Sequence, residues 1–174
     1  YLYTTKHLCL TFRQGTMSVS SYIDAAYNMH EDAKSHSGAA CFVNDSSGAI
    51  SSKSTKQKTT ADSSCAAEII ALSTYAKQAI WFKGVLNALG CQVEKIIIHQ
   101  DNQSTIQLAN NGPTARGKSK WMDVRYFSVK ELVDTGMIKI QYCPTREQLA
   151  DILTKPLTGA QFIVLRDRLL GISA

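Results

Sequence analysis

The hydrophobic period changes part-way along the chain, and this change constrains the fold more than any other feature of the sequence. The first third contains three short runs of strand-forming residues, 18–24, 38–44 and 49–53. Residues 44–48 join the last two and are all Asn, Asp, Ser or Gly, which is typical of a hairpin connection. The first three strands are therefore expected to form an antiparallel meander.

A long helical pattern follows these strands. From residue 63 to 89, apolar residues recur at the spacing of one helix face, and Gly90 lies where a C-terminal cap is expected. Strands are then predicted over residues 95–100 and 138–142, and helices over 103–110, 122–135, 147–154 and 158–170. Strands that alternate with helices after an antiparallel hairpin indicate an α/β fold, with a mixed sheet and helices packed on its faces.

The composition limits the class of protein. A length of 174 residues suits one globular domain. The longest apolar stretches, such as 96–98 and 162–165, are far too short to cross a bilayer, so no membrane partner is expected. Five cysteines without a CxxC pair favour reduced thiols of an intracellular protein over a zinc site or a disulfide framework. The net charge of +5 is compatible with a phosphate-rich partner but does not identify one.

Four acidic residues occupy positions that such a sheet could bring together. Asp24 closes the first predicted strand and Asp101 follows the fourth, so neighbouring strands would place both carboxylates at one edge. Glu68 and Asp151 lie in apolar helical runs, where an unpaired buried charge is unfavourable. A shared counter-ion would satisfy all four acids. Carboxylate oxygens suit Mg²⁺, and two such ions can support phosphodiester hydrolysis.

Each acid also has a local interpretation. Asp24 and Asp101 could be turn or capping residues, and Glu68 could be a first-turn acid favoured by the helix dipole. Asp151 could pair with Lys155, four residues later on the same helix. The spacing of these residues leaves both interpretations open.

Six collinear blocks surround these acids, namely residues 22–25, 48–54 with 56–57, 63–72, 101–104, 120–126 and 148–157. Together they resemble the ribonuclease H domain of copia-type LTR retrotransposon Pol polyproteins. In that family, two Asp residues, a Glu and a final Asp form a metal-binding quartet, and these positions fall on Asp24, Glu68, Asp101 and Asp151.

The resemblance implies a ribonuclease H-like fold, in which three antiparallel strands and then two parallel strands form a five-stranded mixed sheet flanked by helices. It also implies hydrolysis of the RNA strand of RNA–DNA hybrids during reverse transcription, with two Mg²⁺ or Mn²⁺ ions held by the four acids. Residues 1–16 resemble the tail of the preceding reverse-transcriptase region, an expected partner in the same polyprotein. Residues 17–174 would form the ribonuclease H-like domain, located in a cytoplasmic virus-like particle if the element is active.

Basic and polar residues near the acids are candidates for hybrid binding. Lys53 and Lys56 precede the long helix and Lys120 precedes a later one, where they could contact phosphates or simply be solvated. Hybrid recognition depends on shape and 2′-hydroxyl groups more than on base identity. The candidates for 2′-hydroxyl contact are Ser64, Asn102 and Gln103.

Several neighbours of the quartet depart from the family pattern. Ala26 and Ala66 replace acids, Ser52 replaces a tryptophan, and Trp121 replaces a histidine. The alternative hypothesis is therefore a catalytically weak or inactive domesticated module that binds nucleic acid or a protein partner. Retention of all four acids favours the enzyme, because a pure binder has little use for repelling carboxylates.

Overall fold

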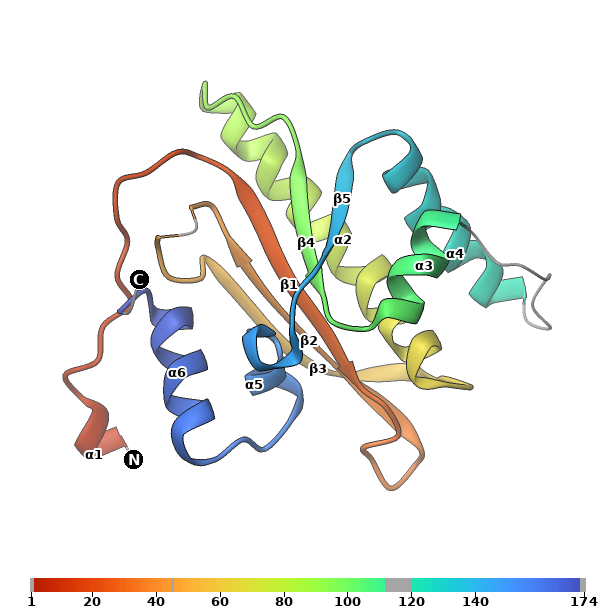
Figure 1. The fold of residues 1–174 in the computed structure, drawn as a ribbon, viewed down its shortest axis with the longest axis horizontal. Coiled ribbons are helices and arrows are strands. Elements are labelled where there is room, and N and C mark those ends of the chain that lie inside the picture. Colours follow the sequence, from red (N-terminus) through yellow and green to blue (C-terminus); the bar gives the residue numbers. More distant parts are fainter. Residues whose placement is uncertain (1, 45, 112–119, 173–174) are drawn as a thin grey trace.

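The structure is a computed structural model that describes residues 2–44, 46–111 and 120–172, with side chains described for 3–44, 46–111 and 124–172. Figure 1 shows the arrangement of its elements. In chain order they are α1 (Leu2–Thr5), β1 (Val19–Ala26), β2 (Lys34–Phe42), β3 (Ser51–Thr60), α2 (Ser64–Ala88), β4 (Ile96–Gln100), α3 (Gln103–Asn111), α4 (Lys120–Asp134), β5 (Ile138–Tyr142), the 3-10 turn η1 (Thr145–Glu147), α5 (Asp151–Thr154) and α6 (Gly159–Leu170).

The five strands form one mixed sheet in the order β3-β2-β1-β4-β5. β1, β2 and β3 pair antiparallel, whereas β4 runs parallel to β1 and β5 runs parallel to β4. The predicted fold class is therefore confirmed. In the β1–β4 ladder Tyr22 lies opposite His99. Continuing that register by two residues brings Asp24 beside Asp101, near the carboxyl ends of both strands.

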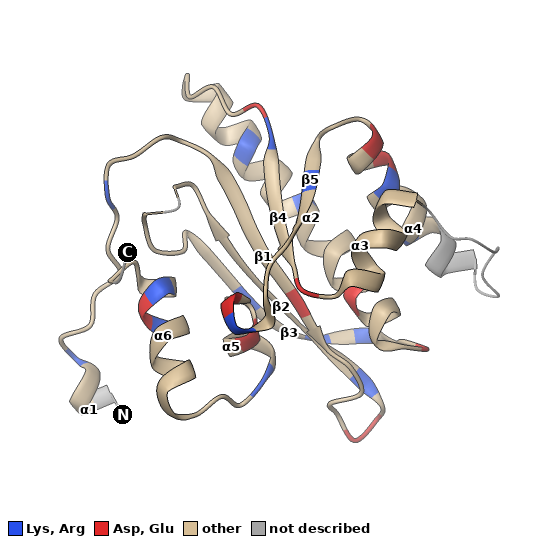
Figure 2. Cartoon of the chain, viewed as in Figure 1, with Lys and Arg blue, Asp and Glu red and all other residues tan. Residues whose placement is uncertain are grey.

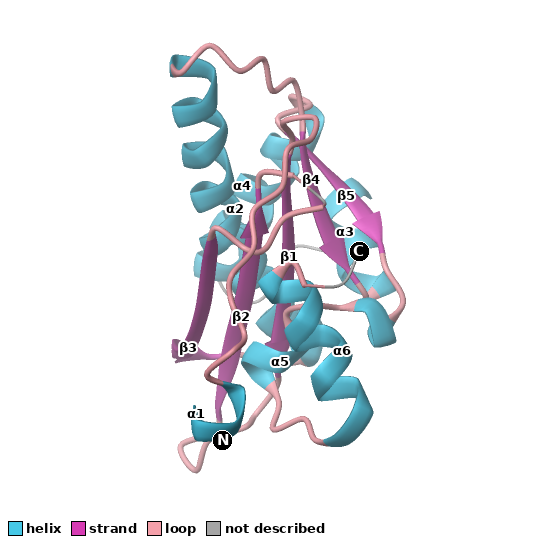
Figure 3. Ribbon diagram, turned by 90° about the vertical axis from the view of Figure 1, so that its left-hand side faces the viewer, coloured by secondary structure: helices cyan, strands magenta, loops and turns pink. Residues whose placement is uncertain are grey.

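The two faces of the sheet carry different helices. α2, α3 and α4 lie on one side, and α5 and α6 lie on the other (Figure 3). Side chains alternate between the faces, because successive residues of a strand point in opposite directions. Ile23 packs in the large core on the α2 side with Ile69 and Leu72. Ala40 and Phe42 pack in the smaller cluster with Leu149 and Leu165. Each fully buried Ile or Leu stabilises such a core by about 1.5–3 kcal/mol.

The start of α2 is fixed by a side-chain cap. The hydroxyl oxygen of Ser63 accepts a hydrogen bond from the backbone N–H of Ala66 at 3.1 Å. This contact satisfies one of the free N–H groups that every helix presents at its first turn. It also places Glu68 one turn inside the helix, where it faces the end of β1.

Several predicted boundaries were wrong. β1 continues to Ala26, so Asp24 lies within the strand and does not close it. β2 begins at Lys34, before the predicted residue 38, and β3 extends to Thr60, beyond the predicted residue 53. β3 is an edge strand whose only buried residue is Gln57, so no apolar alternation marks it. The helix predicted over 147–154 is the end of a 3-10 turn followed by the one-turn α5.

The N-terminal segment runs back along the end of the final helix. The backbone N–H of Thr11 donates to the carbonyl oxygen of Leu170 at 2.8 Å, and that of Gly48 donates to the carbonyl oxygen of Thr11 at 2.8 Å. Thr11 therefore joins α6 to the β2–β3 connection. Within the described part of the chain, no helix combines the length and apolar character that crossing a membrane requires.

Candidate metal centre

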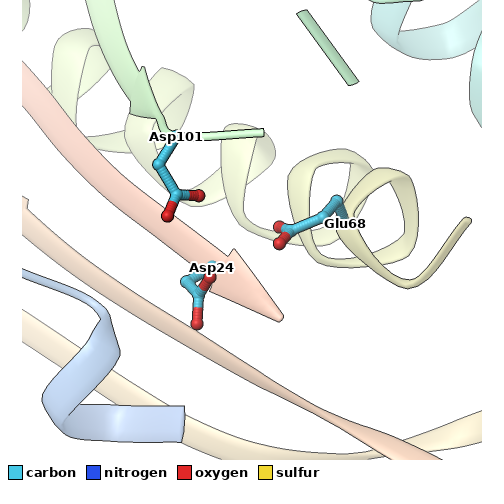
Figure 4. A group of neighbouring side chains, drawn as sticks. All are labelled: Asp24, Glu68 and Asp101. Atoms are coloured by element: carbon cyan, nitrogen blue, oxygen red, sulfur yellow. The ribbon is translucent and has the colours of Figure 1, made fainter. Parts of the chain in front are cut away.

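Three carboxylates from separate elements converge at one edge of the sheet. Asp24 comes from β1, Glu68 from α2, and Asp101 directly follows β4. One oxygen from each carboxylate lies within 4.8 Å of the others, and Figure 4 shows the three groups directed into a common space. Asp24 and Glu68 are buried and Asp101 is partly exposed. Among the described residues, these three form the one group of three or more His, Cys, Asp or Glu residues that meets this spacing. We call them the three-acid group.

Glu68 is held by a buried amide. Gln100, the last residue of β4, donates from Nε2 to a carboxylate oxygen of Glu68 at 3.2 Å. Its Oε1 accepts the backbone N–H groups of Asp101 at 2.9 Å and Asn102 at 3.0 Å. One side chain therefore ties Glu68 to the loop that carries Asp101.

Burial raises the pKa of Glu68 well above its usual range, and the charge of Asp24 raises it further. The hydrogen bond from Gln100 opposes this shift. The ionised carboxylate of Glu68 is therefore poorly stabilised by the protein alone. A cation bound between these carboxylates would supply it.

Asp151 stands apart from the three-acid group. It is the buried first residue of α5, and one of its carboxylate oxygens lies 2.7 Å from Nζ of Lys155. The same ammonium lies 3.7 Å from a carboxylate oxygen of Asp24. The ion pair that the sequence allowed between Asp151 and Lys155 is therefore present. Burial raises the pKa of Asp151 to about 6, even though the hydrogen bond from Lys155 acts in the opposite direction.

The close packing of α5 against the sheet depends on a glycine in β2. Gly38 pairs with Asp24 across the β1–β2 ladder. A Cβ at position 38 would lie 2.6 Å from a methyl carbon of Thr154 and 2.9 Å from the carbonyl oxygen of Ala150. The missing side chain lets α5 approach closely enough for the hydroxyl of Thr154 to donate a hydrogen bond to Asp24.

A second buried glutamine fastens this side of the site. Gln148 donates from Nε2 to the carbonyl oxygen of Ile23 at 3.2 Å and accepts the N–H of Ala150 at 3.3 Å. It thereby links the segment before Asp151 to the strand that carries Asp24. Gln100, Gln148 and Gly38 were not identified from the sequence. The signal for Gln148 was an uncharged polar residue directly before the apolar pair 149–150.

The predicted hybrid-binding residues take different positions. Ser64 and Gln103 are exposed at the first positions of α2 and α3, and Asn102 caps α3 by accepting the N–H of Thr105 at 3.1 Å. Lys53 and Lys56 are exposed on β3, and Lys56 pairs with Asp32 at 2.8 Å. The side chain of Lys120 lies outside the described residues. Substrate contact by all six residues stays a prediction.

Two histidines connect β2 to α5 through Ser54 of β3. Nε2 of His30 lies 3.0 Å from Nδ1 of His36, and Nε2 of His36 lies 2.8 Å from the hydroxyl of Ser54. Ser54 donates to the carbonyl oxygen of Leu153 at 2.7 Å. Since the single hydroxyl hydrogen is used there, Ser54 must accept from His36. These residues line a pocket of about 260 Å³ that also includes Lys155.

Comparison with known proteins places the chain in a family context. No family model matches it. The chain is 34% identical over 167 residues to the retrovirus-related Pol polyprotein from transposon TNT 1-94 of Nicotiana tabacum. The aligned region covers 96% of this chain and 12% of that polyprotein. It is 28% identical over 161 residues to the corresponding polyprotein from transposon RE1 of Arabidopsis thaliana, covering 91% of this chain and 11% of the relative. The chain is a homologue of retrotransposon Pol polyproteins.

Solved structures agree on the fold of this Pol homologue. LC11-RNase H1, isolated from compost by a metagenomic approach, superposes with a TM-score of 0.59 at 12% identity, covering 78% of this chain and 91% of that one. Its complex with an RNA/DNA hybrid gives 0.58 at 12% identity, covering 78% and 92%. The protease–reverse transcriptase of Prototype Foamy Virus gives 0.58 at 15% identity, covering 84% and 21%. The ribonuclease H fold and the predicted relationship to retrotransposon Pol are therefore confirmed.

Proposed function

We propose that this Pol homologue is a metal-dependent endonuclease that hydrolyses the RNA strand of RNA–DNA hybrids during reverse transcription. One observation carries the proposal. Carboxylates from β1, α2 and the end of β4 converge within 4.8 Å at one sheet edge of a ribonuclease H fold. The nucleic-acid nuclease function agrees with the retrotransposon relatives.

The donor set fits a hard divalent cation. All the proposed ligands are carboxylates, the type of ligand that Mg²⁺ and Mn²⁺ prefer. Asp24, Glu68 and Asp101 would hold one ion, and Asp24 with Asp151 would hold a second. Such ions, when bound, supply an activated water and stabilise the leaving oxygen of the phosphodiester.

The chain's own residues orient these ligands. Gln100 fixes the carboxylate of Glu68, and Thr154 fixes one oxygen of Asp24. Gln100 and Thr154 would hold the metal ligands without touching the metal. Loss of a hydrogen bond of this kind typically lowers metal affinity or activity by about 10- to 100-fold. The geometry of the site therefore depends on polar side chains that would not themselves contact a metal ion.

The proposed substrate rests on the structural neighbours and on the positive charge of exposed lysines. One structural neighbour was solved as a complex with an RNA/DNA hybrid, and another is a protease–reverse transcriptase. Exposed lysines line β3 (Figure 2), and we assign phosphate contacts to Lys53 and Lys56 there and to Lys120 at the start of α4. Ser64, Asn102 and Gln103 would contact 2′-hydroxyl groups. The reverse-transcriptase region of the same polyprotein and a cytoplasmic virus-like particle are the proposed partner and location.

A module that binds nucleic acid or a protein partner without cleavage is the second candidate. The observation that favours it is the ion pair of Asp151 with Lys155, since it gives part of the acidic cluster a counter-charge from the chain itself. Cleavage separates the two candidates.

The experiment measures cleavage of an RNA–DNA hybrid labelled on the RNA strand, with Mg²⁺ or Mn²⁺ present. Asp101→Asn should reduce the cleavage rate by at least about 100-fold, because it removes the charge of a proposed metal ligand. This loss exceeds the effect expected when only a hydrogen bond to a ligand is removed. Asp134→Asn makes the same charge change at an exposed position of α4 and should leave the rate unchanged. Wild-type protein that cleaves with neither metal would contradict the enzyme and leave the binding module.

A further inference from the structure

Lys155 occupies one half of the proposed metal centre. Its ammonium lies 2.7 Å from Asp151 and 3.7 Å from Asp24, so it bridges the two carboxylates that would hold the second ion. The side chains of Asp24 and Asp151 are each 3% exposed. Water therefore screens these charges weakly, and the ammonium is their principal counter-charge among the described residues. Acidic and basic residues lie together at α5 in Figure 2.

In the other half of the centre, Glu68 and Asp101 form no ion pair with a described residue. The described polar contacts of Glu68 include the neutral amide of Gln100. Lys155 contacts the three-acid group through Asp24 at 3.7 Å. The half that contains Glu68 and Asp101 is therefore open to a cation. The half that contains Asp151 is already neutralised in part.

We propose that Lys155 is a built-in counter-cation that competes with the second divalent ion. This inference rests on the proposed metal-dependent function. Lys155 must withdraw its ammonium from both carboxylates before Asp24 and Asp151 can take a divalent ion. An ion on Asp24, Glu68 and Asp101 would replace only the longer 3.7 Å contact of Lys155 with Asp24, and the 2.7 Å ion pair with Asp151 could remain. Metal occupancy is therefore sequential, and Lys155 sets the concentration at which the second half fills.

The surroundings give Lys155 room to withdraw. Its side chain is 36% exposed and has a flexible four-carbon stem. Lys155 also lines the pocket of about 260 Å³ that includes His36 and Ser54. The ammonium can thus leave the carboxylates by rotation of its own stem, and α5 can keep its place on the sheet.

The first test measures Mn²⁺ binding to the whole domain by calorimetry and by the electron paramagnetic resonance signal of free Mn²⁺. Lys155→Met should raise the affinity of the weaker site by at least about tenfold, because it removes a unit charge within 4 Å of both carboxylates. Lys155→Arg retains the charge and should retain the weak second site. Lys139→Met removes an exposed lysine from β5 and should bind Mn²⁺ as the wild type does.

A second test needs no metal. In EDTA at pH 7.5, Lys155→Met should melt at a lower temperature than Lys139→Met, and adding Asp151→Asn should restore the loss. Addition of Mn²⁺ should then raise the melting temperature of Lys155→Met more than that of the wild type. This measurement remains informative when the variant is less stable, since it compares each protein with and without metal.

The outcomes separate this inference from the proposed function. If no form binds Mn²⁺, both are overturned. If the wild type binds Mn²⁺ and cleaves hybrid, but Lys155→Met shows unchanged affinity for every ion, the counter-cation role is overturned and the enzyme stands. An equal gain in Lys139→Met would also overturn it, since the effect would then come from net charge.

Discussion

The two halves of the acidic site are built in different ways. Glu68 and Asp101 are carried by the 25-residue α2 and by the end of a central strand, and the main core packs behind them. Asp151 is carried by the four-residue α5, which is positioned by contacts from Gln148 and Thr154. The first half is fixed by the framework of the fold. The second depends on a few side chains and on the close approach of α5 to Gly38, so substitutions of residues other than the acids should disturb it selectively.

The largest effect should come from the framework half. Glu68→Gln should lower the cleavage rate by at least about 100-fold, because it removes the charge of a proposed metal ligand. Loss of a residue that only orients a ligand, such as Gln100, should have a smaller effect. The metal-free fold should nevertheless tolerate Glu68→Gln. The pKa of Glu68 is raised in the folded state, so its stabilising contribution is complete below about pH 4.3 and is lost as the pH rises through the folded pKa.

Melting temperatures in EDTA from pH 5 to pH 8 check this sign. The stability of Glu68→Gln relative to the wild type should increase with pH, because the glutamine never carries the buried charge. Glu131→Gln, at an exposed position on α4, should show a constant difference. A stability difference between Glu68→Gln and the wild type that does not change with pH would contradict this expectation. It would mean that groups of the protein stabilise the ionised Glu68 without a metal.

An intermediate effect is expected at the close approach under α5. Gly38→Ala should destabilise the fold by about 1–3 kcal/mol, because its methyl group meets Thr154 and a backbone carbonyl. For a chain of this size each kcal/mol corresponds to about 2–4 °C in Tm. The cleavage rate should also fall, since α5 carries Asp151.

A glycine of the framework half provides the control. Gly84 lies in α2 with nothing within 4 Å of an added Cβ, so Gly84→Ala should stabilise the helix by roughly 0.5–1 kcal/mol. Opposite signs at the two glycines would confirm that the halves differ in packing tolerance. Equal changes in Tm would show that α5 shifts freely to accept the methyl group.

The smallest effect should come from the contact between β3 and the end of α5. Ser54→Ala removes the hydrogen bond to the carbonyl oxygen of Leu153 and should cost about 1 kcal/mol. Ser52→Ala, at an exposed position of the same strand, is the matched control and should cost less. Urea unfolding of both variants measures the difference. No difference would mean that Ser54 does not help to hold α5.

The sequence predicted the framework half more fully than the other. The helical period of α2 and the apolar strand before Asp101 are strong local patterns, and the family resemblance identified the acids that they carry. The predicted strand at β3 was too short, because the residues of β3 are almost all polar and its length depends on pairing with β2. The ion pair of Asp151 with Lys155 was one of two open interpretations, and it is present in the structure. The role of Asp151 as a metal ligand stays a prediction.

The residues that were missed share a physical feature. Gln100 and Gln148 act through amide hydrogen bonds to groups distant in sequence, and Gly38 acts by having no side chain. No periodicity marks such positions, because their roles appear only when two elements come into contact. Their number near the site explains why its detailed geometry could not be predicted while its acids could.

Gly38 has a consequence for the evolution of such domains. Every glycine codon becomes an alanine codon by one base change, so a single mutation can push α5 away from the strand that carries Asp24. A gene copy with that change would still encode all four acids. A survey that counts acids to separate intact copies from decayed ones would therefore accept it as intact, and the survey should also require glycine at this position.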